Sequence, residues 1–183
     1  MVSTVDSNYM KSFTLIGGVC GVGKTSLLGV LRAMRTDLGI TFDENCSGES
    51  VADRIKAAFA DGINVSYETP LHGDYPKRLC REAKELGYMV RLYYIGLDTA
   101  SECVHRLKHR SGNGDITNAL WELQEQFEQR FSDIGAVLPF CDEAKFLDNN
   151  NGFRFVGRYG NSQIQFVGDH TPAWLQQLSK INC

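Results

Sequence analysis

The chain has 183 residues, a formal net charge of −3 and six cysteines, and none of its apolar runs approaches the ~18 residues of a membrane span. The small negative charge excludes the broad basic surface by which proteins hold nucleic acid. The cysteines form no C-x-x-C pair and no zinc-type spacing, which favours reduced thiols in a cytoplasmic protein. We therefore expect one domain over residues 1–183, with a loose tail at 1–10.

The first predicted elements are a short buried strand over Phe13–Ile16 and, directly after it, the sequence Gly-Val-Cys-Gly-Val-Gly-Lys-Thr at 18–25. That sequence matches the phosphate-binding loop pattern G-x-x-x-x-G-K-[ST]. Apolar residues then recur at helical spacing from Leu27 to Met34, which predicts a helix starting at about Gly23. A strand, a glycine-rich loop and a helix in this order favour a true phosphate loop over a chance glycine-rich turn.

Each residue type in the loop has a chemical reason to be there. Glycines let the backbone N–H groups converge, and the following helix directs its positive end at the same point. Lys24 supplies a charge for the β- and γ-phosphates of ATP, and the Thr25 hydroxyl is placed to coordinate Mg²⁺. The predicted nucleotide-binding residues are Gly18, Val19, Cys20, Gly21, Val22, Gly23, Lys24, Thr25 and Ser26. Asp148 and Asn149, after a later strand, are candidates for contacts with adenine or ribose; the alternative is a plain turn.

Farther along, apolar runs alternate with helical patterns, which predicts an α/β protein with a mostly parallel sheet. The predicted strands are 39–42, 63–67, 89–95 and 144–147, and the predicted helices are 49–60, 75–86, 100–109 and 116–131. Two runs at 153–159 and 163–167 flank Gly-Asn-Ser and predict a β-hairpin, followed by a final helix after Asp169. The predicted fold class is a P-loop NTPase fold: a mostly parallel sheet flanked by helices, with a C-terminal β-hairpin and final helix.

Four residues directly follow predicted strands: Gly18, Asp43, Glu68 and Asp148. Ligands of open parallel sheets bind beyond the carboxyl ends of the strands, so we expect these residues around one crevice. Asp43 is the candidate general base for a hydroxyl acceptor, with Glu44 as a substitute; the alternative is an ordinary turn or cap aspartate.

The loop after the third strand supplies candidates for acceptor binding. Glu68 either supports Mg²⁺ through water, or binds an acceptor hydroxyl, or caps a loop. Thr69 is a second candidate, with the alternative that it only orients Glu68. His72 follows in the same loop and is a candidate for the wall of the acceptor pocket.

A candidate lid spans residues 106–117. Arg106 and Arg110 lie four apart, on one helix face, before a glycine-rich break. Planar guanidinium groups suit the charge that spreads over a transferring phosphoryl group. The alternative is a solvated, charged helix face.

Taken together, these pieces resemble the zeta-toxin family of P-loop kinases over roughly residues 12–150. The matching segments are the loop at 18–25, Asp43-Glu44, the run 54–73 with Tyr-Glu-Thr-Pro-Leu, the segment 81–88, Leu97-Asp98, Arg106 with Arg110, and Asp148-Asn149. The resemblance implies a kinase that uses ATP and Mg²⁺, a UDP-linked amino sugar as acceptor, and an antitoxin-like protein partner. By position it implies Asp43 as the base and Arg106 and Arg110 as the pair that holds the γ-phosphate.

The chain departs from the family in the lid. Family members of this size continue with Gly-Gly-His and several arginines, whereas this chain has Gly-Asn-Gly at 112–114 and Gln-Glu-Gln-Phe-Glu-Gln-Arg at 124–130. The sequence therefore predicts a kinase that phosphorylates a hydroxyl of a small molecule. It leaves open a kinase of another metabolite, a slow NTPase or nucleotide-binding module with a decayed acceptor site, and a binding-only role.

Overall fold

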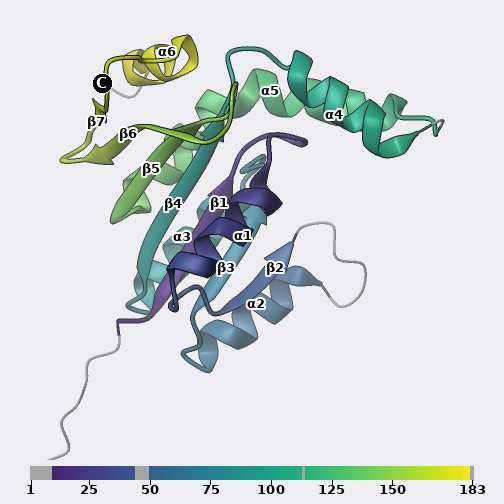
Figure 1. The fold of residues 1–183 in the computed structure, drawn as a ribbon. Helices are drawn as coiled ribbons and strands as arrows, with labels where there is room; N and C mark the ends of the chain where they lie inside the picture. The colour runs from purple at the N-terminus through teal and green to yellow at the C-terminus, as the bar shows by residue number, and fades with distance from the viewer. Residues whose placement is uncertain (1–9, 44–49, 113, 182–183) are drawn as a thin grey trace, which may run out of the picture.

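A computed structural model describes residues 10–43, 50–112 and 114–181. In this part of the chain one sheet has the strand order β2-β3-β1-β4-β5-β6-β7. Its strands are β1 (Ser12–Gly17), β2 (Ile40–Asp43), β3 (Val65–Thr69), β4 (Met89–Gly96), β5 (Glu143–Asp148), β6 (Arg154–Gly160) and β7 (Gln163–Phe166). The first five strands pair in parallel, and β6 and β7 add an antiparallel hairpin at one edge (Figure 1).

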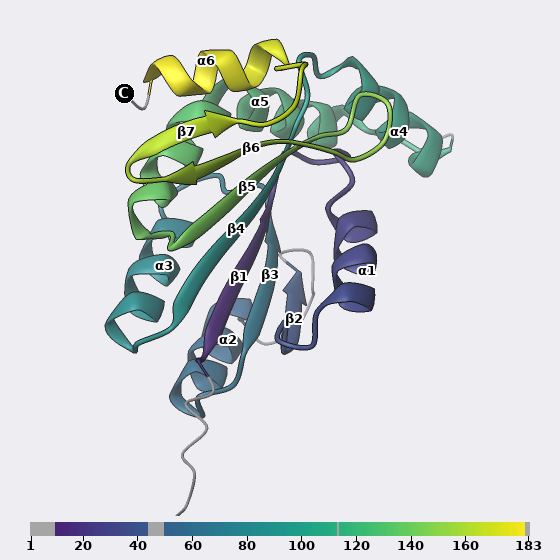
Figure 2. The same ribbon diagram turned by 60° about the vertical axis from the view of Figure 1, so that its left-hand side comes forward.

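Helices cover both faces of the sheet (Figures 1 and 2). They are α1 (Lys24–Met34), α2 (Val51–Ala60), α3 (Tyr75–Glu85), α4 (Ser101–Ser111), α5 (Thr117–Val137) and α6 (Ala173–Ile181), with a short 3₁₀ helix at Leu138–Phe140. One apolar core joins α2, α3, α6 and the end of α5 to the sheet. A second core lies on the opposite face under α1, α4 and the start of α5. No helix in the described residues is long and apolar enough to cross a membrane.

The order of elements confirms the predicted fold class, and two boundaries differ in a way that matters. Helix α5 continues to Val137, because Ile134 and Val137 extend its buried stripe beyond the predicted end at 131. Strand β3 runs through Thr69, so Glu68 lies inside the strand rather than after it. The loose tail expected at 1–10 lies outside the described residues except for residue 10, and Glu44 lies outside them as well.

The central strand shows why the sequence folds in this way. All six residues of β1 are buried, as expected for a parallel strand covered on both faces. Its carboxyl end leads directly into the phosphate loop. At the opposite end of β1, α3 is followed by Gly87, whose positive φ of 77° lets Tyr88 N–H bond back to the Ala83 carbonyl at 2.9 Å. This cap turns the chain into β4, the other neighbour of β1.

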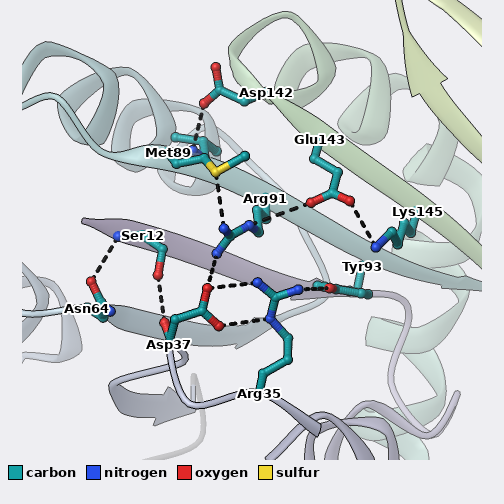
Figure 3. Close-up of polar contacts among 11 residues, drawn as sticks. Ser12, Arg35, Asp37, Asn64, Met89, Arg91, Tyr93, Asp142, Glu143 and Lys145 are labelled. Carbon is teal, nitrogen blue, oxygen red and sulfur yellow. Dashed lines mark hydrogen bonds and ion pairs between the residues drawn. The ribbon is translucent and has the colours of Figure 1, made fainter. Parts of the chain in front are cut away.

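Charged residues connect the start of the sheet to the segment between α1 and β2 (Figure 3). Asp37 accepts hydrogen bonds from Arg35 at 2.7 and 2.9 Å and from Arg91 on β4 at 2.7 Å. Arg91 Nε also forms an ion pair with Glu143 Oε2 on β5, at 3.6 Å. The Ser12 hydroxyl donates to the Asp37 carbonyl at 2.6 Å. These contacts lie at the amino ends of the strands, opposite the phosphate loop, and fix the chain between α1 and β2 to the sheet.

Candidate active site

The loop at 18–25 connects β1 to α1. Gly23 has a φ of 111°, a backbone conformation that residues with a Cβ rarely adopt, and α1 begins at the next residue. Lys24 curls back over the loop, and its Nζ donates to the Gly18 carbonyl at 2.7 Å and to the Val19 carbonyl at 3.2 Å. The glycine-rich sequence thus places a lysine and a helix N-terminus at one point, as an anion site requires.

A cavity of about 830 Å³ opens at this loop, at the carboxyl ends of the strands. Its size falls within the range of small-molecule sites. The residues that line it come from the phosphate loop, from β2, β3 and α4, and from the loop after β5: Cys20, Gly21, Gly23, Lys24, Thr25, Ser26, Asp43, Glu68, Arg106, Leu107, Asn149, Gly152 and Phe153. The fold therefore brings distant parts of the sequence to one site. Of the four residues predicted to surround it from the strand ends, Asp43 and Glu68 line the cavity, and Gly18 and Asp148 do not.

Thr25 and Glu68 form the most specific polar contact in the cavity. The Thr25 hydroxyl donates to Glu68 Oε2 at 2.9 Å, and Glu68 is only 4% exposed. Burial raises the pKa of Glu68, with a smaller contribution from the nearby Asp43 charge, whereas the bond from Thr25 and the charge of Lys24 act to lower it. A buried carboxylate with too little compensating charge is a favourable place for a cation.

The donor set at this point suits Mg²⁺. Magnesium prefers oxygen ligands and is held in nucleotide sites by one or two carboxylates or hydroxyls together with phosphate oxygens and water. Thr25 and Glu68 supply such oxygens beside Lys24, at the start of α1. The described residues contain no cluster of three or more His, Cys, Asp or Glu side chains that could hold a metal ion.

Asp43 is the last residue of β2 and pairs with Glu68 of β3 in the sheet register. Its side chain is partly exposed and lines the cavity, whereas Glu68 is buried. The two carboxylates therefore have different environments: Glu68 is bonded to Thr25, and Asp43 is accessible to a molecule in the cavity.

Arg106, on α4, contacts the phosphate loop itself. Its Nη1 donates to the carbonyls of Gly21 at 3.3 Å and Val22 at 3.2 Å, and its Nε pairs with Glu102 at 3.1 Å. The backbone of Arg110 continues α4, and its side chain lies outside the described part of the structure. The first half of the predicted lid is therefore helical, and Arg106 already lies over the loop.

The two residues at the end of β5 have separate surroundings. Asp148 is buried and accepts a hydrogen bond from the Trp174 indole at 3.1 Å, which anchors α6, and it is not among the residues that line the cavity. Asn149 does line the cavity, and its Nδ2 donates to the Val22 carbonyl at 2.8 Å.

Thr69 and His72, the two other acceptor-site candidates, do not line this cavity either. Thr69 is fully buried, and its hydroxyl accepts a bond from the Leu71 N–H at 3.1 Å. His72 lies against α5, where its Nδ1 is 3.2 Å from Asp133 Oδ2.

Besides Leu107, which falls within the predicted lid at 106–117, three contributors to the site were not identified from the sequence. Gly152 and Phe153 line the cavity from the turn before β6. Gln126 of α5 accepts a hydrogen bond from the Cys20 N–H at 2.8 Å. No local pattern marks these residues, because their position depends on how β5 and α5 pack against the loop.

Comparison with known proteins supports the fold. No family model and no curated protein matches the sequence. A solved chain from the PezAT chromosomal toxin-antitoxin system of the human pathogen Streptococcus pneumoniae matches with a TM-score of 0.63 and 14% identity, over 99% of this chain and 88% of that chain. A gluconokinase from Sinorhizobium meliloti 1021 gives a TM-score of 0.47 and 17% identity, over 77% of this chain and 83% of that chain, and carries no weight here. The likeness to the toxin-antitoxin chain covers nearly all of this chain and confirms the predicted α/β fold, a mostly parallel sheet flanked by helices.

Proposed function

We propose that this protein is a Mg²⁺-dependent kinase that transfers the γ-phosphoryl group of ATP to a hydroxyl of a small molecule. The observation that carries the proposal is the shared cavity: the phosphate loop and the carboxylates of Asp43 and Glu68 line the same space of about 830 Å³. Phosphoryl transfer depends mainly on positioning and on charge neutralisation, and these residues supply both.

Each residue has a role in this proposal. The loop N–H groups and Lys24 bind the phosphates, and Thr25 and Glu68 hold Mg²⁺, which neutralises charge on the phosphates when bound. Asp43 accepts the proton of the acceptor hydroxyl, because its carboxylate is the more exposed of the two in the cavity. Arg106 stabilises negative charge near the loop, from the position in which it holds the Gly21 and Val22 carbonyls.

The choice of acceptors to test follows from the resemblance seen in the sequence. A UDP-linked amino sugar is the first molecule to test, and nucleosides and polyols share its reactive group, a hydroxyl. The experiment is to incubate the protein with Mg-ATP and each acceptor in turn, and to measure ADP release. Release that depends on one acceptor supports the kinase.

The second candidate is a slow NTPase with a decayed acceptor site. It is favoured by α5, where the family that the sequence resembles carries arginines. On this helix the chain has Gln124 and Glu128, which bond to each other at 2.6 Å and supply no positive charge. Slow ADP release that no acceptor accelerates supports this alternative. No ADP release and no ATP binding would contradict both.

A further inference from the structure

The Val22 carbonyl in the phosphate loop is held by two side chains from other elements. Asn149 Nδ2 donates to it at 2.8 Å, and Arg106 Nη1 donates to it at 3.2 Å. Asn149 is 7% exposed and directly follows β5, and its own N–H points at the Gly96 carbonyl of β4 at 3.4 Å. The backbone of Asn149 is therefore fixed to the sheet, and its side-chain amide holds the loop from there.

Holding this carbonyl also sets the direction of the next N–H. The described residues contain no cis peptide bond, so the Val22 carbonyl and the Gly23 N–H point to opposite sides of one planar unit. With the oxygen turned toward Asn149, the Gly23 N–H is turned away from it, at the N-terminus of α1. Backbone N–H groups at this point of such a loop are the ones that bind phosphate.

Asn149 also packs directly against Gly23. A Cβ at Gly23 would lie 2.9 Å from Asn149 Nδ2, so a larger residue there would require the amide to move. The side chain thus limits both the rotation of the Val22–Gly23 peptide and the space beside it.

We propose that Asn149 is a positioning residue for phosphate binding, which acts by orienting the Gly23 N–H, and that this is its role in place of a contact with adenine or ribose. The inference rests on the proposed function, since it requires that the loop bind the phosphates of ATP. It predicts that loss of the amide weakens binding of phosphate groups in general and leaves recognition of the nucleoside unchanged.

Two substitutions separate the possibilities. Asn149→Ala removes the donor, and Asn149→Asp keeps the shape but replaces the NH₂ group by a second acceptor oxygen. Asn150→Ala is the matched control, because the neighbouring amide bonds to Asp148 at 2.9 Å and not to the loop. Melting temperatures show whether each variant is folded. If Asn149→Ala does not fold, Asn149→Asp serves as the test.

The experiment is calorimetry with Mg-ATP, magnesium tripolyphosphate and adenosine, together with the ¹H–¹⁵N resonance of Gly23. In the two Asn149 variants we expect about tenfold weaker binding of ATP and of tripolyphosphate, which is the scale of one lost hydrogen bond. Adenosine binding should not change, and the shift of the Gly23 resonance on adding tripolyphosphate should be lost. Asn150→Ala should match the wild type.

The contrary results are equally specific. Weaker adenosine binding with unchanged tripolyphosphate binding would make Asn149 a nucleoside contact. Unchanged affinities and an unchanged Gly23 shift in both variants would also overturn the inference, while leaving the proposed function in place. Failure of the wild type to bind ATP would instead overturn the proposed function itself.

Discussion

Asp37→Asn should destabilise the fold by an amount that depends on pH. In the wild type, the hydrogen bonds from Arg35, aided by the charge of Arg91, lower the pKa of Asp37 from 3.8 to about 2. At about 1.4 kcal/mol per pKa unit, this corresponds to about 2 kcal/mol of stability. The Asp37 side chain is 26% exposed, so solvent screening reduces the expected loss to roughly 1–2 kcal/mol.

The pH dependence follows from the lowered pKa. A carboxyl group whose pKa is lower in the folded state stabilises the fold above its unfolded pKa. The contribution of Asp37 is therefore present at neutral pH, falls as the pH drops below 3.8 and is lost below about 2. An asparagine side chain at this position does not titrate, so the difference between the two proteins should close over this range.

Urea denaturation of both proteins at pH 7, 5, 4 and 3 measures the difference. Asp169→Asn, at an exposed position, is the control and should change the free energy of unfolding by less than about 0.5 kcal/mol. A loss below about 0.5 kcal/mol for Asp37→Asn at pH 7, or a loss that stays constant down to pH 3, would refute the proposed role of the network in Figure 3.

Three further predictions concern packing and the cavity. Gly96→Ala should destabilise the fold by about 1–3 kcal/mol in thermal unfolding, because its Cβ would lie 2.4 Å from the Trp174 ring. Gly29→Ala is the control: its Cβ would meet nothing within 4 Å, so it should stabilise α1 by about 0.5–1 kcal/mol. Equal effects of the two substitutions would contradict the packing of Gly96 against Trp174. Asp43→Asn should bind Mg-ATP normally but slow transfer by ~10²–10⁴-fold in a turnover assay, and more than half of wild-type turnover would exclude it as the base. Glu68→Gln should need more Mg²⁺ for half-maximal activity. Because burial raises the pKa of Glu68, the wild type should lose stability as pH rises above 4.5 and the variant should not, which melting temperatures from pH 4 to 7 will show.

The parts of the fold that the sequence predicts are those governed by local rules. The phosphate loop needs its glycines and Lys24 at fixed spacing, and buried parallel strands such as β1 are short apolar runs. The position of Asp43 beside Glu68 follows from the rule that parallel strands end at one edge.

The remaining features depend on contacts between distant segments. Asp148 is the last residue of its strand, as Asp43 is, yet it bonds to Trp174 because α6 packs over the end of β5. Asn149 reaches the Val22 carbonyl, and Gln126 reaches the Cys20 N–H, across 127 and 106 positions of sequence. No periodicity or local motif encodes such distances, so these roles require the structure.

The central claim is that the loop at 18–25 binds Mg-ATP through its phosphates. Calorimetry of the wild type and of Lys24→Ala, with Mg-ATP and with ATP plus a chelator, tests it most directly. We expect the wild type to bind ATP more tightly with Mg²⁺ than without it, and Lys24→Ala to lose this binding at an unchanged melting temperature. Undiminished, Mg²⁺-dependent binding by Lys24→Ala, or no binding by the wild type, would contradict the account.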